Sequence, residues 1–143
     1  MNWYKKSQLN SEIINKYKIL ISEFIDRNSD YMNKILTDKN WAKGTCSSVS
    51  RDLVKFFQEK GIKSQVIGCT GLIPELPEDA HEDWLKFKGE KQKYLWHAVV
   101  KTEDSIIDLT GGQYGEIFSG VQINPINEYL NQWNNTKIHD KDY

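Results

Sequence analysis

The stretch Gly44-Thr45-Cys46-Ser47-Ser48 marks the point at which a loop leads into a helix. Over residues 47–60 apolar side chains recur on one helical face, at Val49, Leu53, Phe56 and Phe57. Gly61 follows as a stop signal, so Cys46 lies at or just before the first turn of this helix. Unpaired backbone N–H groups and the positive end of the helix dipole favour a thiolate there. Cys46 is therefore either a small buried packing residue or a nucleophile.

Two more helices are predicted upstream of this stretch. Apolar residues three to four positions apart indicate an amphipathic helix over residues 10–26, with Asn10 or Ser11 as its N-cap. After a polar break at residues 27–30, a second apolar series indicates a shorter helix that ends at residues 37–40.

Downstream the pattern changes to strands. Residues 62–70 are predicted as one strand and residues 94–101 as a second. A tight turn at residues 103–105 brings the chain back antiparallel as a third strand, residues 105–110, which Gly111-Gly112 ends. Helices that come first and an antiparallel sheet that comes later are typical of the α+β class.

The connection over residues 71–93 is long for a compact domain, and we expect it to be a functional loop that holds the substrate preference. A short helix near residues 77–87 is one option within it. Asn124-Pro125 opens a final segment in which apolar residues up to Trp133 keep helical spacing. The polar tail over residues 134–143 is expected to fray.

Composition limits the class of protein. The 143 residues are 38% hydrophobic and 12% aromatic, which fits one globular domain over residues 1–143 with a core of its own. The net charge of −1 gives no electrostatic basis for binding nucleic acid or an anionic membrane. Two cysteines make no disulfide framework, and the first residues lack an apolar run of signal-peptide length, so a cytoplasmic location is expected.

Three residues in chain order match the needs of a cysteine nucleophile. Cys46 would attack, His97 in the second strand would take its proton, and Asp108 in the third would orient the imidazole. Asn40, six residues before Cys46, and Gln113 are candidate oxyanion or substrate-binding groups. Trp96 is a candidate wall of the cleft, where it would exclude water around the thiolate.

These residues resemble the papain-like superfamily. The resemblance covers residues 40–113 and rests on the stretch 44–48 at the start of a helix, the strand 96–100, the segment 107–110, and Gln113 after it. Aspartate as the third member is similar to the transglutaminase-like proteases and to the papain-fold deamidase toxins and effectors of bacteria.

This resemblance implies N-terminal helices packed on a mainly antiparallel sheet, in a bacterial or phage protein. It also implies a hydrolase or acyltransferase that acts on amide bonds through a thioester, as a protease, a glutamine deamidase or a transglutaminase. No cofactor and no metal would be needed, the substrate would be a protein or peptide, and the location would be the cytoplasm or a target cell that receives an effector. In papain a glutamine stands where this chain has Asn40, and an aromatic residue stands where it has Ser47.

Each candidate also has a plainer interpretation. His97 can be a satisfied core histidine, Asp108 a turn cap, and Cys46 buried filler. The alternative function is then a non-catalytic binding or inhibitory protein on a papain-like scaffold, with Trp84 and Phe87 as anchors. Cys69 is expected to be a packing residue of the first strand.

Overall fold

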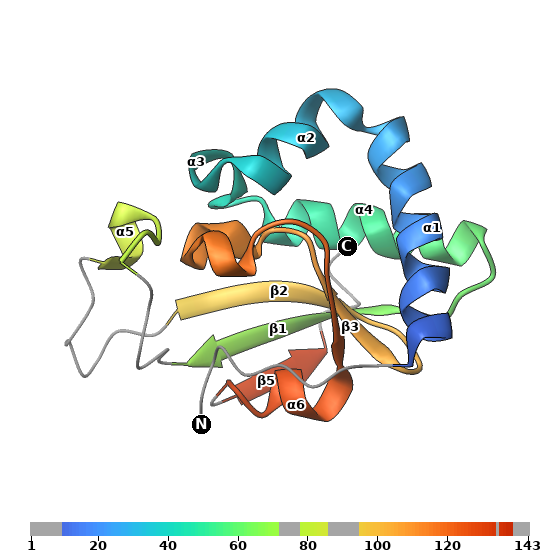
Figure 1. Ribbon diagram of the computed structural model, residues 1–143. Helices are drawn as coiled ribbons and strands as arrows, with labels where there is room; N and C mark the ends of the chain where they lie inside the picture. Colours follow the sequence, from blue (N-terminus) through green and yellow to red (C-terminus); the bar gives the residue numbers. More distant parts are fainter. Residues whose placement is uncertain (1–9, 72–77, 86–94, 134, 139–143) are drawn as a thin grey trace.

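The computed structural model describes residues 10–71, 78–85, 95–133 and 135–138, and the structural statements below concern these residues. N-terminal helices pack against a five-stranded antiparallel sheet with strand order β4-β3-β2-β1-β5 (Figure 1). The predicted α+β class, with helices first and the antiparallel sheet after them, is confirmed.

Four helices precede the sheet: α1 (Ser11–Arg27), α2 (Ser29–Thr37), α3 (Lys39–Ala42) and α4 (Cys46–Glu59). The Asn10 side chain caps α1 by accepting a hydrogen bond from the Glu12 amide at 2.7 Å, as an N-cap should. None of the helices in the described segments is long and apolar enough to cross a membrane.

The short helix α3 corrects the sequence prediction, which let the second helix end in a loop over residues 37–40. α2 does end at Thr37, but the Asp38 carboxylate then accepts a hydrogen bond from the Asn40 amide at 2.8 Å and starts a new turn. Gly44 at φ +83° then turns the chain into α4, in a backbone region that favours glycine.

The sheet consists of β1 (Gln65–Gly71), β2 (Leu95–Lys101), β3 (Ser105–Asp108), β4 (Gln122–Pro125) and β5 (Asn135–Ile138). β1, β2 and β3 confirm the three predicted strands with shorter bounds. Two small 3₁₀ turns, η1 (Gly111–Tyr114) and η2 (Glu116–Phe118), follow the predicted strand break, and α6 (Ile126–Leu130) forms the predicted helical segment after β4.

The predictions for the C-terminal part were incomplete. β4 was not predicted, and the tail predicted to fray contains β5, which pairs antiparallel with β1 through Cys69↔Thr136 and its neighbours. β5 is held at the sheet edge by backbone hydrogen bonds, and its side chains are mostly exposed. Its sequence therefore lacks the alternation of apolar and polar residues that predicts a strand. Of the long connection, residues 78–85 are described and contain α5 (Glu82–Leu85), whereas residues 72–77 and 86–94 lie outside the described part.

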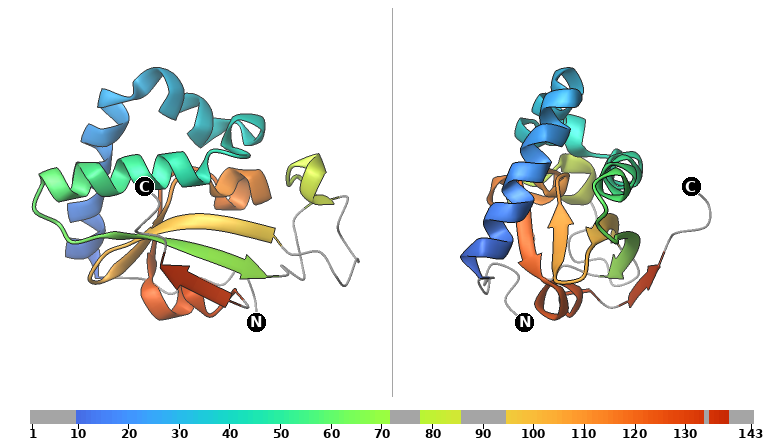
Figure 2. Two further views of the ribbon diagram at one scale, coloured as in Figure 1. Left: turned by 180° about the vertical axis from the view of Figure 1, so that it is seen from behind. Right: turned by 90° about the vertical axis from the view of Figure 1, so that its right-hand side faces the viewer.

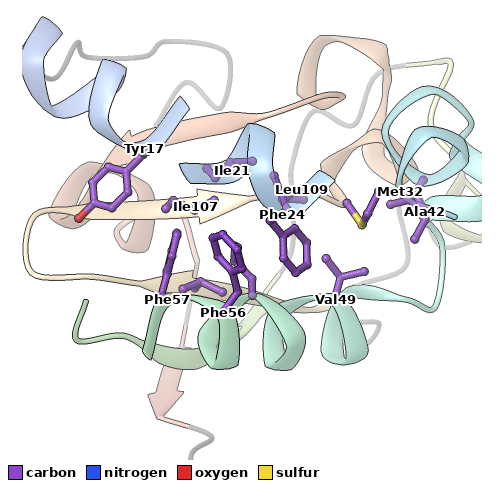
Figure 3. Close-up of a cluster of buried hydrophobic side chains, with 13 residues drawn as sticks. Tyr17, Ile21, Phe24, Met32, Ala42, Val49, Phe56, Phe57, Ile107 and Leu109 are labelled. Atoms are coloured by element: carbon purple, nitrogen blue, oxygen red, sulfur yellow. The ribbon is translucent and has the colours of Figure 1, made fainter. Parts of the chain in front are cut away.

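Two hydrophobic clusters hold these layers together. One lies between the helices α1, α2 and α4 and the sheet, with Phe24 packed edge-on against Phe56 at 5.6 Å between ring centroids (Figure 3). The other gathers side chains of the sheet, η1, η2 and α6: Ile67, Cys69, Val99, Ile106, Tyr114, Phe118, Tyr129 and Trp133. Helices α2, α3 and α4 lie above the sheet and α6 below it in Figure 1, and α1 runs down beside the sheet, as Figure 2 also shows.

Candidate active site

Cys46 is the first residue of α4. The preceding residue, Thr45, is the N-cap but does not cap with its side chain, because its hydroxyl donates to the Ala42 carbonyl at 2.8 Å. The first turn of this 14-residue helix therefore lacks the usual side-chain acceptor, and the partial positive charge of its N-terminus lies next to the sulfur. Cys46 is 6% exposed and packs with Val66 and Ala98 of the sheet.

His97 lies in β2 and is fully buried. Its ring is fixed between two aromatic side chains. Tyr114 meets it edge-on, with centroids 5.1 Å apart, and Trp133 stacks on it at 6.0 Å with an interplanar angle of 25°. Such packing leaves the imidazole little freedom to rotate and holds it in one orientation.

Asp108 is the last residue of β3, and one of its oxygens binds the imidazole. His97 Nε2 lies 2.8 Å from Asp108 Oδ2. The same oxygen accepts a hydrogen bond from the Tyr129 hydroxyl at 3.1 Å, and Oδ1 accepts one from the Thr110 amide at 3.0 Å. An ionised carboxylate only accepts hydrogen bonds, so we assign the proton of this contact to Nε2.

The other ring nitrogen of His97, Nδ1, is buried and has no hydrogen-bond partner among the described residues. Burial alone lowers the pKa of His97, but the charge and the hydrogen bond of Asp108 and the neighbouring Cys46 thiol together raise it to about 10. Because Nε2 is engaged by Asp108, Nδ1 is the ring nitrogen that remains for the Cys46 thiol. Cys46, His97 and Asp108 are thus brought together, each from a different element.

The three remaining predicted residues lie differently. Gln113 in η1 is buried. Its side-chain oxygen accepts a hydrogen bond from Trp84 Nε1, and its side-chain nitrogen donates one to the Thr110 carbonyl, each at 3.1 Å. Trp96, beside His97 in β2, is 38% exposed, and its carbonyl accepts from the Tyr114 hydroxyl. The oxyanion or substrate-binding roles of these residues remain predictions.

Asn40 is exposed on α3, where it lines a surface hollow of about 770 Å³ with residues of α2, η1 and η2. Within the described segments its side chain makes no hydrogen bond with Cys46, His97 or Asp108. Gly44, at φ +83°, lies between α3 and α4 and turns the chain there. The oxyanion role proposed for Asn40 stays a prediction.

The segment 78–85 is attached to the elements around the site by polar contacts. The Lys43 ammonium pairs with the Asp83 carboxylate at 2.5 Å, and the Lys39 ammonium donates to the Asp79 carbonyl at 3.1 Å. The His81 amide donates to the Gln113 carbonyl at 2.7 Å. In the part of the chain that the structure describes, no three side chains of the metal-ligating types come together.

Sequence reasoning missed two residues of this site. Tyr129 and Trp133 were counted only as apolar positions of the last helical segment, yet one binds Asp108 and the other stacks on His97. The available signal was chemical, since a buried tyrosine hydroxyl needs a hydrogen-bond partner. Cys69, predicted to be a packing residue, is fully buried and lies directly across the β1–β2 ladder from His97.

The described geometry is therefore a buried thiol, imidazole and carboxylate with an aromatic surround. Cys46 and His97 interact, and His97 and Asp108 share a short hydrogen bond. Comparisons of the chain with known protein families, with curated proteins and with solved structures found no match.

Proposed function

We propose that this protein is a papain-like cysteine hydrolase or acyltransferase that acts on amide bonds through a Cys46-His97-Asp108 triad. The observation that carries the proposal is the 2.8 Å contact between His97 Nε2 and Asp108 Oδ2, made while the same ring interacts with the thiol at a helix N-terminus. A nucleophile, its base and a group that orients the base are the parts that such chemistry needs.

In the first half of the reaction, the Cys46 thiol loses its proton to water, and the His97 ring, kept protonated by Asp108, stabilises the thiolate. The sulfur then attacks the substrate carbonyl, and an S–C bond forms while the carbonyl electrons move to oxygen. When the carbonyl re-forms, the C–N bond breaks, and the imidazolium gives its proton to the leaving amine. The product of this half-reaction is a thioester on Cys46.

The acceptor decides the outcome of the second half-reaction. His97 takes a proton from the acceptor as its oxygen or nitrogen attacks the thioester, and the S–C bond then breaks and restores the Cys46 thiolate beside the protonated ring. With water the result is proteolysis or glutamine deamidation, and with an amine it is transglutamination. The proposed substrate is a protein or peptide.

Alkylation of the two cysteines tests the nucleophile. Iodoacetamide at mildly acidic pH should modify Cys46 of the folded protein well ahead of Cys69, and His97→Ala should slow that reaction. Replacement of the other described histidine, His81→Ala, is the matched control, because that ring bonds the Asp83 amide and not the thiol. Equal labelling of both thiols in the native protein would remove the activated nucleophile from the proposal.

A second candidate function is binding without catalysis. Cys46 is 6% exposed and His97 is fully buried. By contrast, Trp41 of α3 is 47% exposed and Trp96 of β2 is 38% exposed. Exposed aromatic side chains are typical anchors of protein interfaces. Of the anchors predicted earlier, Trp84 is half-buried and bonded to Gln113, and Phe87 lies outside the described residues.

The variant Cys46→Ala separates the two functions. A biological effect that survives this change belongs to binding, and an effect that is lost while the fold persists belongs to catalysis. Intact-mass analysis of candidate partner proteins after incubation then identifies the reaction. A gain of about one mass unit at a glutamine indicates deamidation, a cut chain indicates proteolysis, and a crosslinked product indicates transglutamination.

A further inference from the structure

Asp108 Oδ2 is shared by two donors that come from different elements of the fold. His97 of β2 approaches it at 2.8 Å, and the hydroxyl of Tyr129 in α6 donates to it at 3.1 Å. Asp108 and Tyr129 are each 6% exposed, so water does not readily replace either bond. The reaction steps described above make no use of the Tyr129 hydroxyl.

This second donor fixes the direction of the carboxylate. The Thr110 amide donates a hydrogen bond to the other oxygen of Asp108, Oδ1, at 3.0 Å. The terminal torsion of an aspartate is broad, so a single backbone bond to Oδ1 leaves Oδ2 free to move out of line with the imidazole. A buried hydroxyl on Oδ2 removes that freedom.

The same C-terminal segment also fixes the ring that the carboxylate binds. Trp133 stacks on His97 with ring centroids 6.0 Å apart. Tyr129 lies in α6, and Trp133 follows the end of this helix. One short segment thus holds both partners of the His97–Asp108 contact. A purely space-filling helix would bury apolar side chains there and would need no hydroxyl directed at the carboxylate.

We propose that Tyr129 is a positioning residue of this site, whose hydroxyl holds Asp108 Oδ2 in line with His97 Nε2 and thereby keeps Nδ1 available to Cys46. This inference rests on the proposed function and adds a fourth residue to it. Tyr129 touches no reacting atom and acts through Asp108 alone.

The titratable groups that surround His97 and Asp108 come from several elements: Cys46 of α4, Cys69 of β1, Tyr114 of η1 and Tyr129 of α6. Burial raises the pKa of Tyr114 and of Tyr129 well above the usual range, so both hydroxyls stay protonated at neutral and mildly alkaline pH. Burial likewise raises the pKa of the Cys69 thiol. A change of the His97 pKa after substitution of Tyr129 therefore reports on Asp108.

The test is an NMR titration of the histidine ring nitrogens in the whole chain, which has three histidines, His81, His97 and His139. Tyr129→Phe should lower the pKa of His97 by about one unit, a tenfold change in proton affinity, because the loosened carboxylate no longer stays at Nε2. The loss of a donor also leaves more negative charge on Oδ2, which by itself would raise the pKa. A downward shift therefore supports positioning, and an upward shift or no shift overturns it.

Tyr114→Phe is the matched control. Tyr114 is as deeply buried as Tyr129 and contacts the same ring, but its hydroxyl donates to the Trp96 carbonyl and not to Asp108. The His97 pKa should stay in place in this variant even if the melting temperature falls, whereas an equal shift in both variants overturns the role of Tyr129. If Tyr129→Phe does not fold, Tyr129→Met replaces it, because an adaptable apolar side chain also removes the hydroxyl from Asp108. The same downward shift is then expected, and its absence overturns the inference.

Thiol labelling distinguishes the failure of this inference from the failure of the proposed function. If Cys46 of the unaltered protein reacts no faster than Cys69 with iodoacetamide, the nucleophile is not activated, and both proposals fall. If Cys46 reacts fast and folded Tyr129→Phe has an unchanged His97 pKa, only the positioning role falls. Fast labelling that slows in Tyr129→Phe together with the downward shift supports both.

Discussion

His97 and Asp108 lie on neighbouring strands but not directly opposite each other. β2 and β3 pair through Val100↔Ile107 and Lys101↔Ile106, and the continuation of that register places Asp108 across from Val99. His97 is two residues further along the same face, a diagonal neighbour that a long side chain can reach. The 2.8 Å contact between Nε2 and Oδ2 spans this diagonal.

The contact predicts how stability depends on pH. His97 has a pKa of about 10 in the folded protein against a reference value of 6.5, so between these values the folded state holds a proton that the unfolded state has released. The stabilisation is complete below about pH 6.5. The free energy of unfolding should fall as pH rises from there to about 10, by on the order of 1 kcal/mol per pH unit.

Urea denaturation at several pH values measures this slope. Asp108→Asn should flatten it, because the carboxylate is the main group that raises the pKa. Asp26→Asn, a change at an exposed carboxylate of α1, should keep the slope of the unaltered protein. A slope that is the same in the Asp108 and Asp26 variants would contradict the assignment.

Gly111 is predicted to tolerate no side chain. A Cβ atom there would lie 2.5 Å from the Phe118 carbonyl oxygen and 3.2 Å from Asp108 Oδ2. Because a backbone oxygen cannot rotate away, Gly111→Ala should cost about 1–3 kcal/mol of stability and slow alkylation of Cys46. In Gly112→Ala the nearest atom is the Ser119 Cβ at 3.2 Å, so a smaller loss is expected. Thermal melts of the two variants compare them, and equal losses would argue against this contact.

Gln113 offers a way to separate a structural role from an oxyanion role. Gln113→Leu removes the hydrogen bonds to Trp84 Nε1 and to the Thr110 carbonyl, and should cost about 1–3 kcal/mol because these groups lose their partner. If the role is structural, turnover measured well below the melting temperature stays near that of the unaltered protein. A loss of about 10²–10³-fold in kcat in the folded variant would instead identify an oxyanion donor. Gln58→Leu, at an exposed position of α4, controls for the substitution itself.

The hydroxyl of Tyr17 joins α1 to the turn between β2 and β3. It lies 2.7 Å from both Thr102 Oγ1 and Asp104 Oδ1, and burial raises the pKa of Tyr17 to about 12. Tyr17→Phe should therefore destabilise the fold by about 2 kcal/mol, as the loss of a hydrogen bond to a charged group does. Ile19→Ala on the same helix removes a side chain that is 72% exposed and should change little. Chemical denaturation of both variants measures how much the Tyr17 hydrogen bonds contribute to the free energy of unfolding.

The sequence by itself determined the main helices, the three central strands and the order of the site residues. Local patterns, set by neighbours in the chain, were enough for these elements. They include the helical spacing of apolar residues in α4, the stop signal at Gly61 and the turn that leads into Ser105. The same local signals placed Cys46 at the start of a helix and His97 and Asp108 on adjacent strands.

The tertiary structure alone decided what surrounds that site. Tyr129 is 21 residues from Asp108 in the chain, and nothing in its own segment indicates that its hydroxyl meets that carboxylate. β5 joins the sheet by backbone pairing, which leaves no side-chain pattern, and Asn40 is exposed on α3 whereas Cys46 is buried. Contacts between distant residues depend on how whole elements pack, and periodicity reports only the face that each element buries.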